Sequence, residues 1–505
     1  MGAPNIGEIF SYSKPSIILI FISILAFKSV KILKETEHQR VMRLSCRLDF
    51  LSKNNKEEKA VMSEIDLLRR DSSHLIHPLH APSAHLSGKV WDSGEGAFLR
   101  DVDGNRFIDG LSGLWNNTAG NGRVELAEAA STQMRKMGYA SGYIGSTNLP
   151  AIELAERLAA IAYSNINHFY FTSGGGESTD SNIKLARYYW KLKGKPEKTK
   201  IISRIWGYHG TTLAAMCATG ISTFWPMFEP RIPGFIHIPG PYPYRYESSG
   251  DESQGVAAAN ELEKAILSEG PDTVAMFIAE PVQGAGGVIV PQDDYFARIR
   301  EICDTYEVLL VSDEVITVFG RTGKMFGLEH YGIQPDMIQF AKAITSGYFP
   351  LGGIGVSDQI AQTMDESGKP WMHAYTYSAH PTGCAVALAM LDIIEKEDFP
   401  GQAAAKGTYL LDSLREAFDE HPHVGDIRGK GLMCAVEFVK DRETKAEFDV
   451  AAGIGPKIHA AGVSRGMFSR VRGDVYCIAP PIITETNTLD DIVQILVEST
   501  KEVLG

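Results

Sequence analysis

From about residue 124 onward, short apolar runs of strand length alternate with helical segments such as Ser181–Lys191 and Asp294–Tyr306. The apolar runs are His168–Thr172, Lys200–Ser203, Val274–Ala279, Val308–Ser312 and Met337–Phe340. This alternation is typical of βαβ units, so the pattern predicts an α/β fold with a largely parallel sheet covered by helices on both faces. In such sheets, ligands bind at the carboxyl ends of the strands.

Different patterns flank this region. Ala97–Gly110 alternates apolar and polar residues around Asp103–Asn105, which predicts a β-hairpin at the start of a smaller lobe. Beyond about Cys384, a long helical stretch leads to a mixed α+β region in which Gly431–Phe438 has the pattern of a strand. We therefore expect an extension over residues 1–61, a large domain over 122–383, and a smaller domain with an N-terminal part over 62–121 and a C-terminal part over 384–505.

The first 61 residues contain one apolar segment, Ile17–Phe27, which is shorter than the ~20 residues of a membrane-spanning helix. From Lys28 to Lys59, nine Lys or Arg stand against five Asp or Glu, a modest basic excess that is similar to an organelle transit peptide. The extension is thus a weak anchor, a targeting segment or an extension without function. We expect a cytoplasmic folded core, with residues 1–61 as the only basis for mitochondrial or membrane association.

Composition narrows the class of partner. Hydrophobic residues (44%) and charged residues (22%) occur at the proportions of soluble domains, which argues against a disordered or polytopic membrane chain. The net charge of −13 opposes non-specific nucleic-acid binding and favours small-molecule partners. The six cysteines are widely spaced, without a CxxC pair, so the sequence predicts neither a disulfide framework nor a cysteine zinc site.

Three chemically distinctive features follow predicted strands. Ser173–Glu177 (SGGGE) precedes a helix, where backbone N–H groups could bind a phosphate. Asp313 and Lys342 end apolar strands, where desolvation would lower the pKa of a lysine and free its amine as a nucleophile. Taken singly, each is more often a tight turn or a charge that reaches water. Together they are the contacts that pyridoxal phosphate (PLP) requires: a phosphate cradle, an acid for the ring nitrogen and an amine.

Residues 62–505 resemble the class III aminotransferases of fold type I, within them the ω-amino acid and amine:pyruvate transaminases. The most specific stretch is Leu309–Gly353, in which Asp313 and Lys342 lie 29 residues apart. The resemblance implies a mostly parallel seven-stranded sheet in the large domain. It also implies that Lys342 binds PLP covalently and relays protons, that Asp313 pairs with the pyridine nitrogen, and that Val315 packs beneath the ring.

Further positions match by their own motifs. Tyr208, in WGYHG, would stack on the cofactor ring, and Gly175 and Gly176 match the phosphate-binding pair. Thr376, in YTYSAHP, matches a threonine that reaches the phosphate of the neighbouring subunit, which implies a homodimer with shared active sites. Glu280, in AEPVQG, matches a glutamate near the cofactor.

Three positions depart from the family pattern. Gly176 stands where the family usually has serine, so phosphate binding there would depend on backbone N–H groups. Val318 and Ala379 stand where glycine is usual. We expect these departures to alter the fine geometry around the cofactor more than the reaction.

Two positions bear on substrate. Trp115 fits a pocket tryptophan of the amine:pyruvate group, and Arg470 fits the arginine that swings to bind a carboxylate, with Arg472 as a nearby competitor. The planar fork of arginine suits this task because it meets a carboxylate with two hydrogen bonds. A solvated surface arginine is the alternative.

The histidines do not predict a metal site. Four of them lie close together in sequence, and so do two near residue 422, but we expect no convergent carboxylate or cysteine to complete a ligand set. Surface histidines are the preferred interpretation. These residues are His74, His77, His80 and His85, and His421 and His423.

The sequence is therefore interpreted as a PLP-dependent aminotransferase that moves an amino group from a primary amine or ω-amino acid to pyruvate or another 2-oxo acid by a ping-pong mechanism. One alternative is a PLP-dependent isomerase or decarboxylase of the same fold. Others are a 2-oxoglutarate-dependent 4-aminobutyrate-type transaminase and a biotin-pathway aminotransferase. A membrane-tethered, non-catalytic protein is the alternative from a different class.

Overall fold

The computed structural model describes residues 63–248 and 250–505, and it divides the chain into two compact units, residues 1–90 and 91–505. The first unit contains helix α3 (Glu64–Ser72) and the 3-10 turn η1 (Pro82–Ser87). Ser63 begins α3 because its side chain accepts a hydrogen bond from the backbone N–H of Asp66. The predictions for residues 1–61 lie outside the described residues. Within the described residues, no helix combines the length and apolar character needed to cross a membrane.

A seven-stranded sheet forms the centre of the second unit, in the order β4-β10-β9-β8-β7-β5-β6. β10 is antiparallel to both of its neighbours, and the other neighbouring pairs are parallel. The predicted, mostly parallel sheet is thus confirmed. Its strands are β4 (Ile166–Thr172), β5 (Lys200–Arg204), β6 (Phe235–Ile238), β7 (Val274–Ala279), β8 (Leu309–Asp313), β9 (Met337–Phe340) and β10 (Gly352–Ser357).

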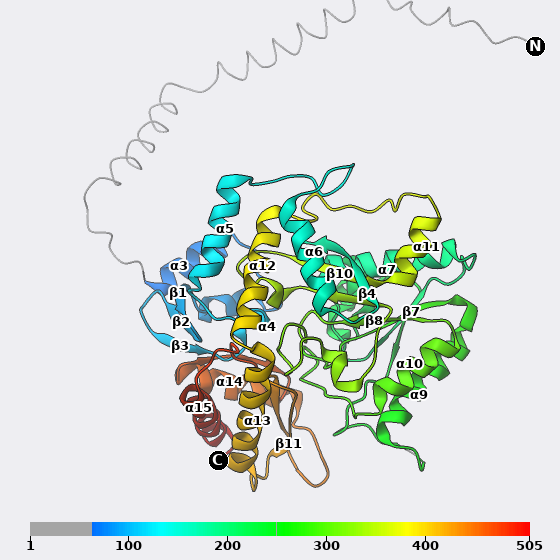
Figure 1. Ribbon diagram of the computed structural model, residues 1–505. Coiled ribbons are helices and arrows are strands. Elements are labelled where there is room, and N and C mark those ends of the chain that lie inside the picture. The colour runs from blue at the N-terminus through cyan, green and yellow to red at the C-terminus, as the bar shows by residue number, and fades with distance from the viewer. Residues whose placement is uncertain (1–62, 249) are drawn as a thin grey trace, which may run out of the picture. The chain divides into compact units, whose positions relative to one another are not determined.

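Helices cover both faces of this sheet (Figure 1). On β7, Met276 and Ile278 pack into a cluster with α7 (Gly175–Leu192) and α11 (Asp358–Glu366). The alternate residue Phe277 packs into the larger cluster with α9 (Gln254–Glu269) and α10 (Tyr295–Thr305). Every residue of β7 is buried, which explains its uninterrupted apolar sequence.

Two smaller sheets complete the second unit, in the orders β1-β2-β3-β13 and β11-β12-β15-β14. β2 and β3 form the predicted hairpin, and β3 pairs in parallel with β13, so segments far apart in sequence share one sheet. The strands are β1 (Trp91–Glu95), β2 (Phe98–Asp101), β3 (Arg106–Asp109), β11 (Val424–Gly429), β12 (Cys434–Phe438), β13 (Met467–Phe468), β14 (Arg470–Arg472) and β15 (Val475–Ile478).

The remaining helices pack around these sheets. The last, α15, lies against α13 and α14. The remaining helices are α4 (Ser112–Trp115), α5 (Val124–Lys136), α6 (Leu149–Ile161), α8 (Leu213–Ala218), α12 (Pro381–Lys396), α13 (Phe399–Phe418), α14 (Ile454–Ser464) and α15 (Thr486–Leu504). The 3-10 turns of the second unit are η2 (Ser222–Phe224), η3 (Pro226–Phe228), η4 (Pro271–Thr273), η5 (Gly327–Tyr331), η6 (Lys342–Ile344) and η7 (Val450–Ala452).

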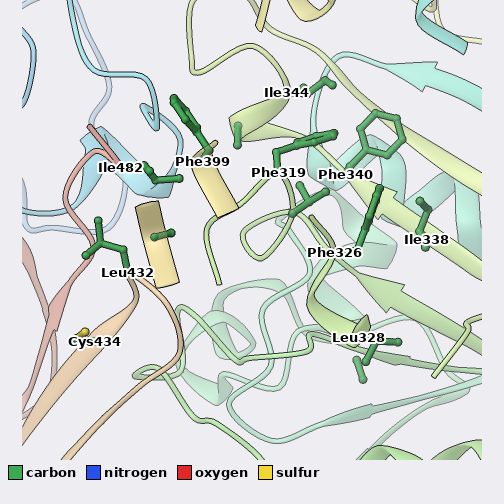
Figure 2. Packing of buried hydrophobic residues seen from close by; sticks show 14 of the residues in the cluster. Phe319, Phe326, Leu328, Ile338, Phe340, Ile344, Phe399, Leu432, Cys434 and Ile482 are labelled. Atoms are coloured by element: carbon green, nitrogen blue, oxygen red, sulfur yellow. The ribbon is translucent and has the colours of Figure 1, made fainter. Parts of the chain in front are cut away.

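One apolar cluster connects the large sheet to the C-terminal region (Figure 2). Phe319 packs edge-on against the Phe340 ring at a centroid distance of 6.2 Å, next to the turn that begins at Lys342. The same cluster includes Cys434 on β12 and Ile482 beyond β15. The strand ends that carry the chemically distinctive residues are therefore fixed by a packed core.

Candidate active site

Lys342 begins η6, directly after β9 and Ala341, and has a positive φ of 48°. This left-handed conformation is uncommon for a residue with a side chain and often marks a functional site. Lys342 is only partly accessible, and burial lowers the pKa of its amine to about 8. Asp313 and Glu280 oppose that shift and Arg470 adds to it, so the structure brings these four charged groups near one another.

Asp313 ends β8 and is 2% exposed. One of its carboxylate oxygens, Oδ2, lies 2.7 Å from Nδ1 of the buried His209. The other, Oδ1, accepts a hydrogen bond from the backbone N–H of Val315. These contacts satisfy a buried acid only in part, because each carboxylate oxygen can accept more than one hydrogen bond.

A polar cradle is formed where α7 begins. Gly174 provides no side-chain cap, and no described acceptor meets the backbone N–H groups of Gly175, Gly176 and Glu177. Free N–H groups and the helix dipole make such a terminus a binding site for a phosphate. A Cβ placed on Gly176 would lie 3.4 Å from Thr212 Cγ2, so Thr212 borders the cradle.

Residues that would surround a cofactor ring lie beside these groups. The Val315 methyl groups are 3.1 to 3.2 Å from the position of a Cβ on Gly175, which places Val315 at the beginning of α7. Tyr208 is half-buried, burial raises its pKa, and Arg470 opposes this rise. Val315, Tyr208 and the cradle are thus held close to the buried acid.

Glu280 holds the loop that presents Tyr208. It is buried just beyond β7, where Oε1 accepts the Tyr208 backbone N–H at 3.0 Å and Oε2 accepts the Gly284 N–H at 2.9 Å. Burial raises its pKa, and the His209 imidazole opposes that rise. Glu280 therefore positions the backbone around Tyr208.

The two candidate arginines occupy different environments on β14. Arg470 is half-buried, and its charge acts on both Tyr208 and Lys342. The Arg472 guanidinium lies over the Trp206 ring, 4.2 Å from its centroid. Arg472 is thus engaged in a cation–π contact, whereas the charge of Arg470 acts on the lysine and the tyrosine.

Trp115 lies in a buried apolar cluster with Val282 and Ile316 and is 1% exposed. It has a positive φ of 63°. Its Nε1 is buried and has no hydrogen-bond partner among the residues that the structure describes.

Thr376 lies on an exposed segment. Its carbonyl oxygen accepts a hydrogen bond from the Tyr139 hydroxyl at 2.8 Å. Of the departures from the family pattern, Ala379 has a positive φ of 54° and Val318 is fully buried in the core.

Two nearby residues were not assigned from the sequence. His209 stands next to Tyr208 in the WGYHG motif, and this adjacency was the available signal for its contact with Asp313. Thr212 gave no signal, because only folding brings it to Gly176.

The expectation that no carboxylate joins the first histidine group is wrong. Asp71, at the end of α3, contacts both His77 and His85 within the first unit. The cause is local: the chain turns back after α3 and returns through η1, a path that residue spacing did not indicate.

The arrangement in the second unit fits PLP. The cradle at α7 can bind the phosphate, and the Asp313 carboxylate can accept a hydrogen bond from a protonated ring nitrogen. The Lys342 amine can react with the aldehyde carbon.

Comparisons with known proteins agree with this arrangement. The family model of class III aminotransferases matches residues 81–499. The diaminobutyrate–2-oxoglutarate transaminase of Halomonas elongata is 39% identical over 445 residues, which cover 85% of this chain and 94% of that protein. The putrescine–pyruvate aminotransferase of Pseudomonas aeruginosa is 39% identical over 408 residues, covering 80% and 89%.

Solved structures give the same result. An (S)-enantioselective ω-transaminase from Thermomicrobium roseum is 46% identical with a TM-score of 0.84, over 88% of this chain and 99% of that one. The ω-transaminase of Pseudomonas jessenii, solved in complex with PMP, is 36% identical with a TM-score of 0.83, over 86% and 99%. Class III aminotransferases are PLP-dependent enzymes. By fold, by the residues at the strand ends and by these matches, the chain belongs to the class III aminotransferases.

Proposed function

We propose that this enzyme transfers an amino group from a primary amine or an ω-amino acid to pyruvate, in two half-reactions that use PLP held at Lys342. The observation that carries the proposal is the partly accessible lysine, whose pKa burial lowers to about 8 within reach of Asp313, Glu280 and Arg470. An amine of this kind is neutral often enough near neutral pH to act as a nucleophile and a base.

Each residue around Lys342 has a defined task in this reaction. PLP, when bound, supplies an electron sink that lets the amino group move from donor to acceptor. Asp313, oriented by His209, would keep the ring nitrogen protonated, and the N-terminus of α7 would hold the phosphate. Tyr208 and Val315 would enclose the ring and exclude water. Lys342 would take up and return the proton that moves during each half-reaction.

Arg470 supports an acceptor that carries a carboxylate. Its guanidinium can bind the carboxylate of pyruvate or of an ω-amino acid with two hydrogen bonds. Its flexible stem would let it withdraw when the donor carries an apolar substituent. We assign Trp115 to the amine side of the pocket, where its buried Nε1 is available to a polar group.

The test uses the full-length chain loaded with PLP. Addition of a primary amine should remove the visible absorption band of the bound cofactor, and pyruvate should restore it with formation of alanine. A band that forms but does not cycle with any amine and 2-oxo acid would contradict transamination by this site.

The acceptor has one specific rival, 2-oxoglutarate, because a relative at 39% identity is named a diaminobutyrate–2-oxoglutarate transaminase. The putrescine–pyruvate relative at the same identity supports pyruvate. A screen of both acids against putrescine, 4-aminobutyrate and an arylalkylamine separates them: preference for 2-oxoglutarate with every donor would reject the pyruvate assignment.

The working unit is proposed to be a homodimer. Thr376 is exposed on its own chain, where a phosphate held by a neighbouring subunit could contact it. This arrangement would make each active site depend on two chains.

A further inference from the structure

A carboxylate and two histidines gather in the first unit, outside the aminotransferase site. Asp71 comes from the end of α3, His77 from the loop that follows, and His85 from η1. One ligand atom from each, the Asp71 oxygen and two imidazole nitrogens, lies within 4.8 Å of both others. All of these residues are half-buried, so the cluster is formed by folding yet remains reachable from solvent.

The two imidazoles share one carboxylate oxygen. His77 Nε2 lies 2.6 Å from Asp71 Oδ2, and His85 Nε2 contacts the same oxygen. The two rings stack with centroids 3.6 Å apart and planes 15° apart. Three potential ligand atoms, the Asp71 Oδ2 oxygen and the two Nε2 nitrogens, therefore lie together.

The contact between His77 Nε2 and Asp71 Oδ2 is close but does not have the geometry of a hydrogen bond. The nitrogen lies 2.6 Å from the oxygen, and it has no hydrogen-bond partner among the described residues. In the neutral imidazole, such a nitrogen can give its lone pair to a cation.

We propose that Asp71, His77 and His85 bind one divalent transition-metal ion, with Zn²⁺ as the best fit. Two imidazole nitrogens and one carboxylate oxygen suit Zn²⁺, whereas Ca²⁺ and Mg²⁺ prefer oxygen ligands. Three protein ligands leave a fourth position for water. Bonds of about 2.0–2.2 Å set tetrahedral ligand atoms roughly 3.3–3.5 Å apart, so binding moves Asp71 and His77 apart by less than about 1 Å.

His80 supplies an outer contact. Its Nε2 lies 3.1 Å from His85 Nδ1, the nitrogen that would face away from the metal. Metal-binding histidines usually donate this second N–H to a partner that fixes the ring. His80 therefore orients His85 without binding the ion.

The ion would link the end of α3 to η1. Asp71 and His85 are separated in sequence, so an ion bound to both closes a loop of the chain. Because the ion would bind only the folded first unit, it would stabilise that folded state by mass action. The inference concerns a site separate from PLP and does not depend on the proposed transamination.

The test titrates Zn²⁺ into the full-length, PLP-loaded chain after removal of metals by chelation, with isothermal calorimetry as the readout. The wild type should bind one ion per chain. Asp71→Asn, His77→Gln and His85→Gln should each weaken binding by at least about 100-fold, because outer partners alone contribute about 10–100-fold. His80→Gln should fall in that 10–100-fold range. His74→Gln, in the same segment but outside the cluster, is the matched control and should bind as the wild type does.

A second readout guards against misfolded variants. Co²⁺ in place of Zn²⁺ should give visible bands of low-coordinate cobalt in the wild type, and His77→Cys should keep binding and add thiolate-to-cobalt absorption. Absence of stoichiometric binding in the wild type would overturn the proposal. Binding that persists unchanged in all three ligand variants would place the ion elsewhere and overturn it equally. The PLP absorption band reports the other site throughout, so loss of cofactor binding is distinguished from loss of the metal.

Discussion

At the scale of single residues, the chemistry depends on how burial changes ordinary side chains. Lys342 and Lys198 both have a pKa lowered to about 8 by burial, yet their surroundings differ. The Lys198 amine donates to four backbone carbonyl oxygens, which fixes it as a structural group. Lys342 instead lies under the influence of the Asp313 and Glu280 carboxylates, and we infer that its amine remains available for reaction.

Replacement of Lys342 tests that availability. Lys342→Ala should reduce alanine formation from amine and pyruvate by at least about 10²–10⁴-fold, the contribution of acid–base catalysis alone. Lys342→Arg keeps the charge but provides no nucleophilic amine, so it should be equally inactive. The exposed Lys324→Ala is the control and should retain activity. Retained turnover in Lys342→Ala would remove the lysine from the mechanism.

The pKa of Lys342 also predicts a pH dependence. The amine is charged below about pH 8 and neutral above it, and only the neutral amine attacks an aldehyde. The rate at which the cofactor-free chain captures added PLP should therefore rise with pH through a midpoint near 8 and then level off. Stopped-flow absorbance over a pH series measures this rate. A midpoint near 10.5, the ordinary lysine value, would show that burial does not act on Lys342 as inferred.

Arg470 predicts selective loss of carboxylate substrates. Arg470→Ala should lower kcat/KM for pyruvate and ω-amino acids by roughly 10- to 100-fold, because a hydrogen bond to a charged group contributes about 1.5–3 kcal/mol. The half-reaction with a simple arylalkylamine should change much less. Arg472→Ala is the matched control, since Arg472 lies over Trp206. Equal losses with both substrate types would refute the assignment.

At the scale of elements, the glycine loop and α7 decide how firmly a phosphate is held. Gly176 lacks the serine hydroxyl that the family usually has, and a Cβ there would meet Thr212 at an ordinary contact distance of 3.4 Å. Gly175 differs, because a Cβ there would press on two Val315 methyl groups at 3.1 and 3.2 Å. We therefore expect a side chain to be tolerated at Gly176 but not at Gly175.

Gly176→Ser should tighten PLP binding by about 2- to 10-fold, since one added hydrogen bond contributes about 0.5–1.5 kcal/mol. Gly175→Ser introduces the same hydroxyl one residue earlier and should weaken binding by displacing Val315. Fluorescence titration of the cofactor-free variants with PLP gives both constants. Weaker binding in Gly176→Ser would mean that the loop has adapted to glycine.

Elements also show where sequence reasoning succeeds. β7 was predicted because its apolar run is continuous, as expected of a strand buried on both faces. β10 was missed because its sequence, GGIGVS, lacks that signal. Its glycines are explained only by the fold: a Cβ on Gly353 would lie 2.5 Å from the Phe340 ring.

The same distinction applies to the site. Asp313 and Lys342 were predicted because each lies at or just beyond the end of an apolar strand. Asp71 was missed because its partners come from a loop and a 3-10 turn, which no periodicity reveals. Contacts made by the path of a loop are set by packing and cannot be read from residue spacing.

At the scale of the whole molecule, an exposed face adjoins Thr376. Tyr139 and Tyr377 are 44% and 60% exposed, and their rings meet edge to face. Exposed aromatic side chains beside a residue that is proposed to act on a second subunit are consistent with a surface that a partner covers.

Shared active sites can be tested by mixing two inactive variants. Lys342→Ala removes the reactive amine, and Thr376→Glu should expel the phosphate by placing a like charge beside it. If Thr376 serves the neighbouring subunit, a mixed dimer has one site with Lys342 from the Thr376→Glu chain and Thr376 from the Lys342→Ala chain, both intact. Co-expression with two affinity tags should then restore at most about one quarter of wild-type activity, because half of random dimers are mixed and each has one intact site. If each site were built from a single chain, every site in the mixed dimer would carry one defect and no activity would return.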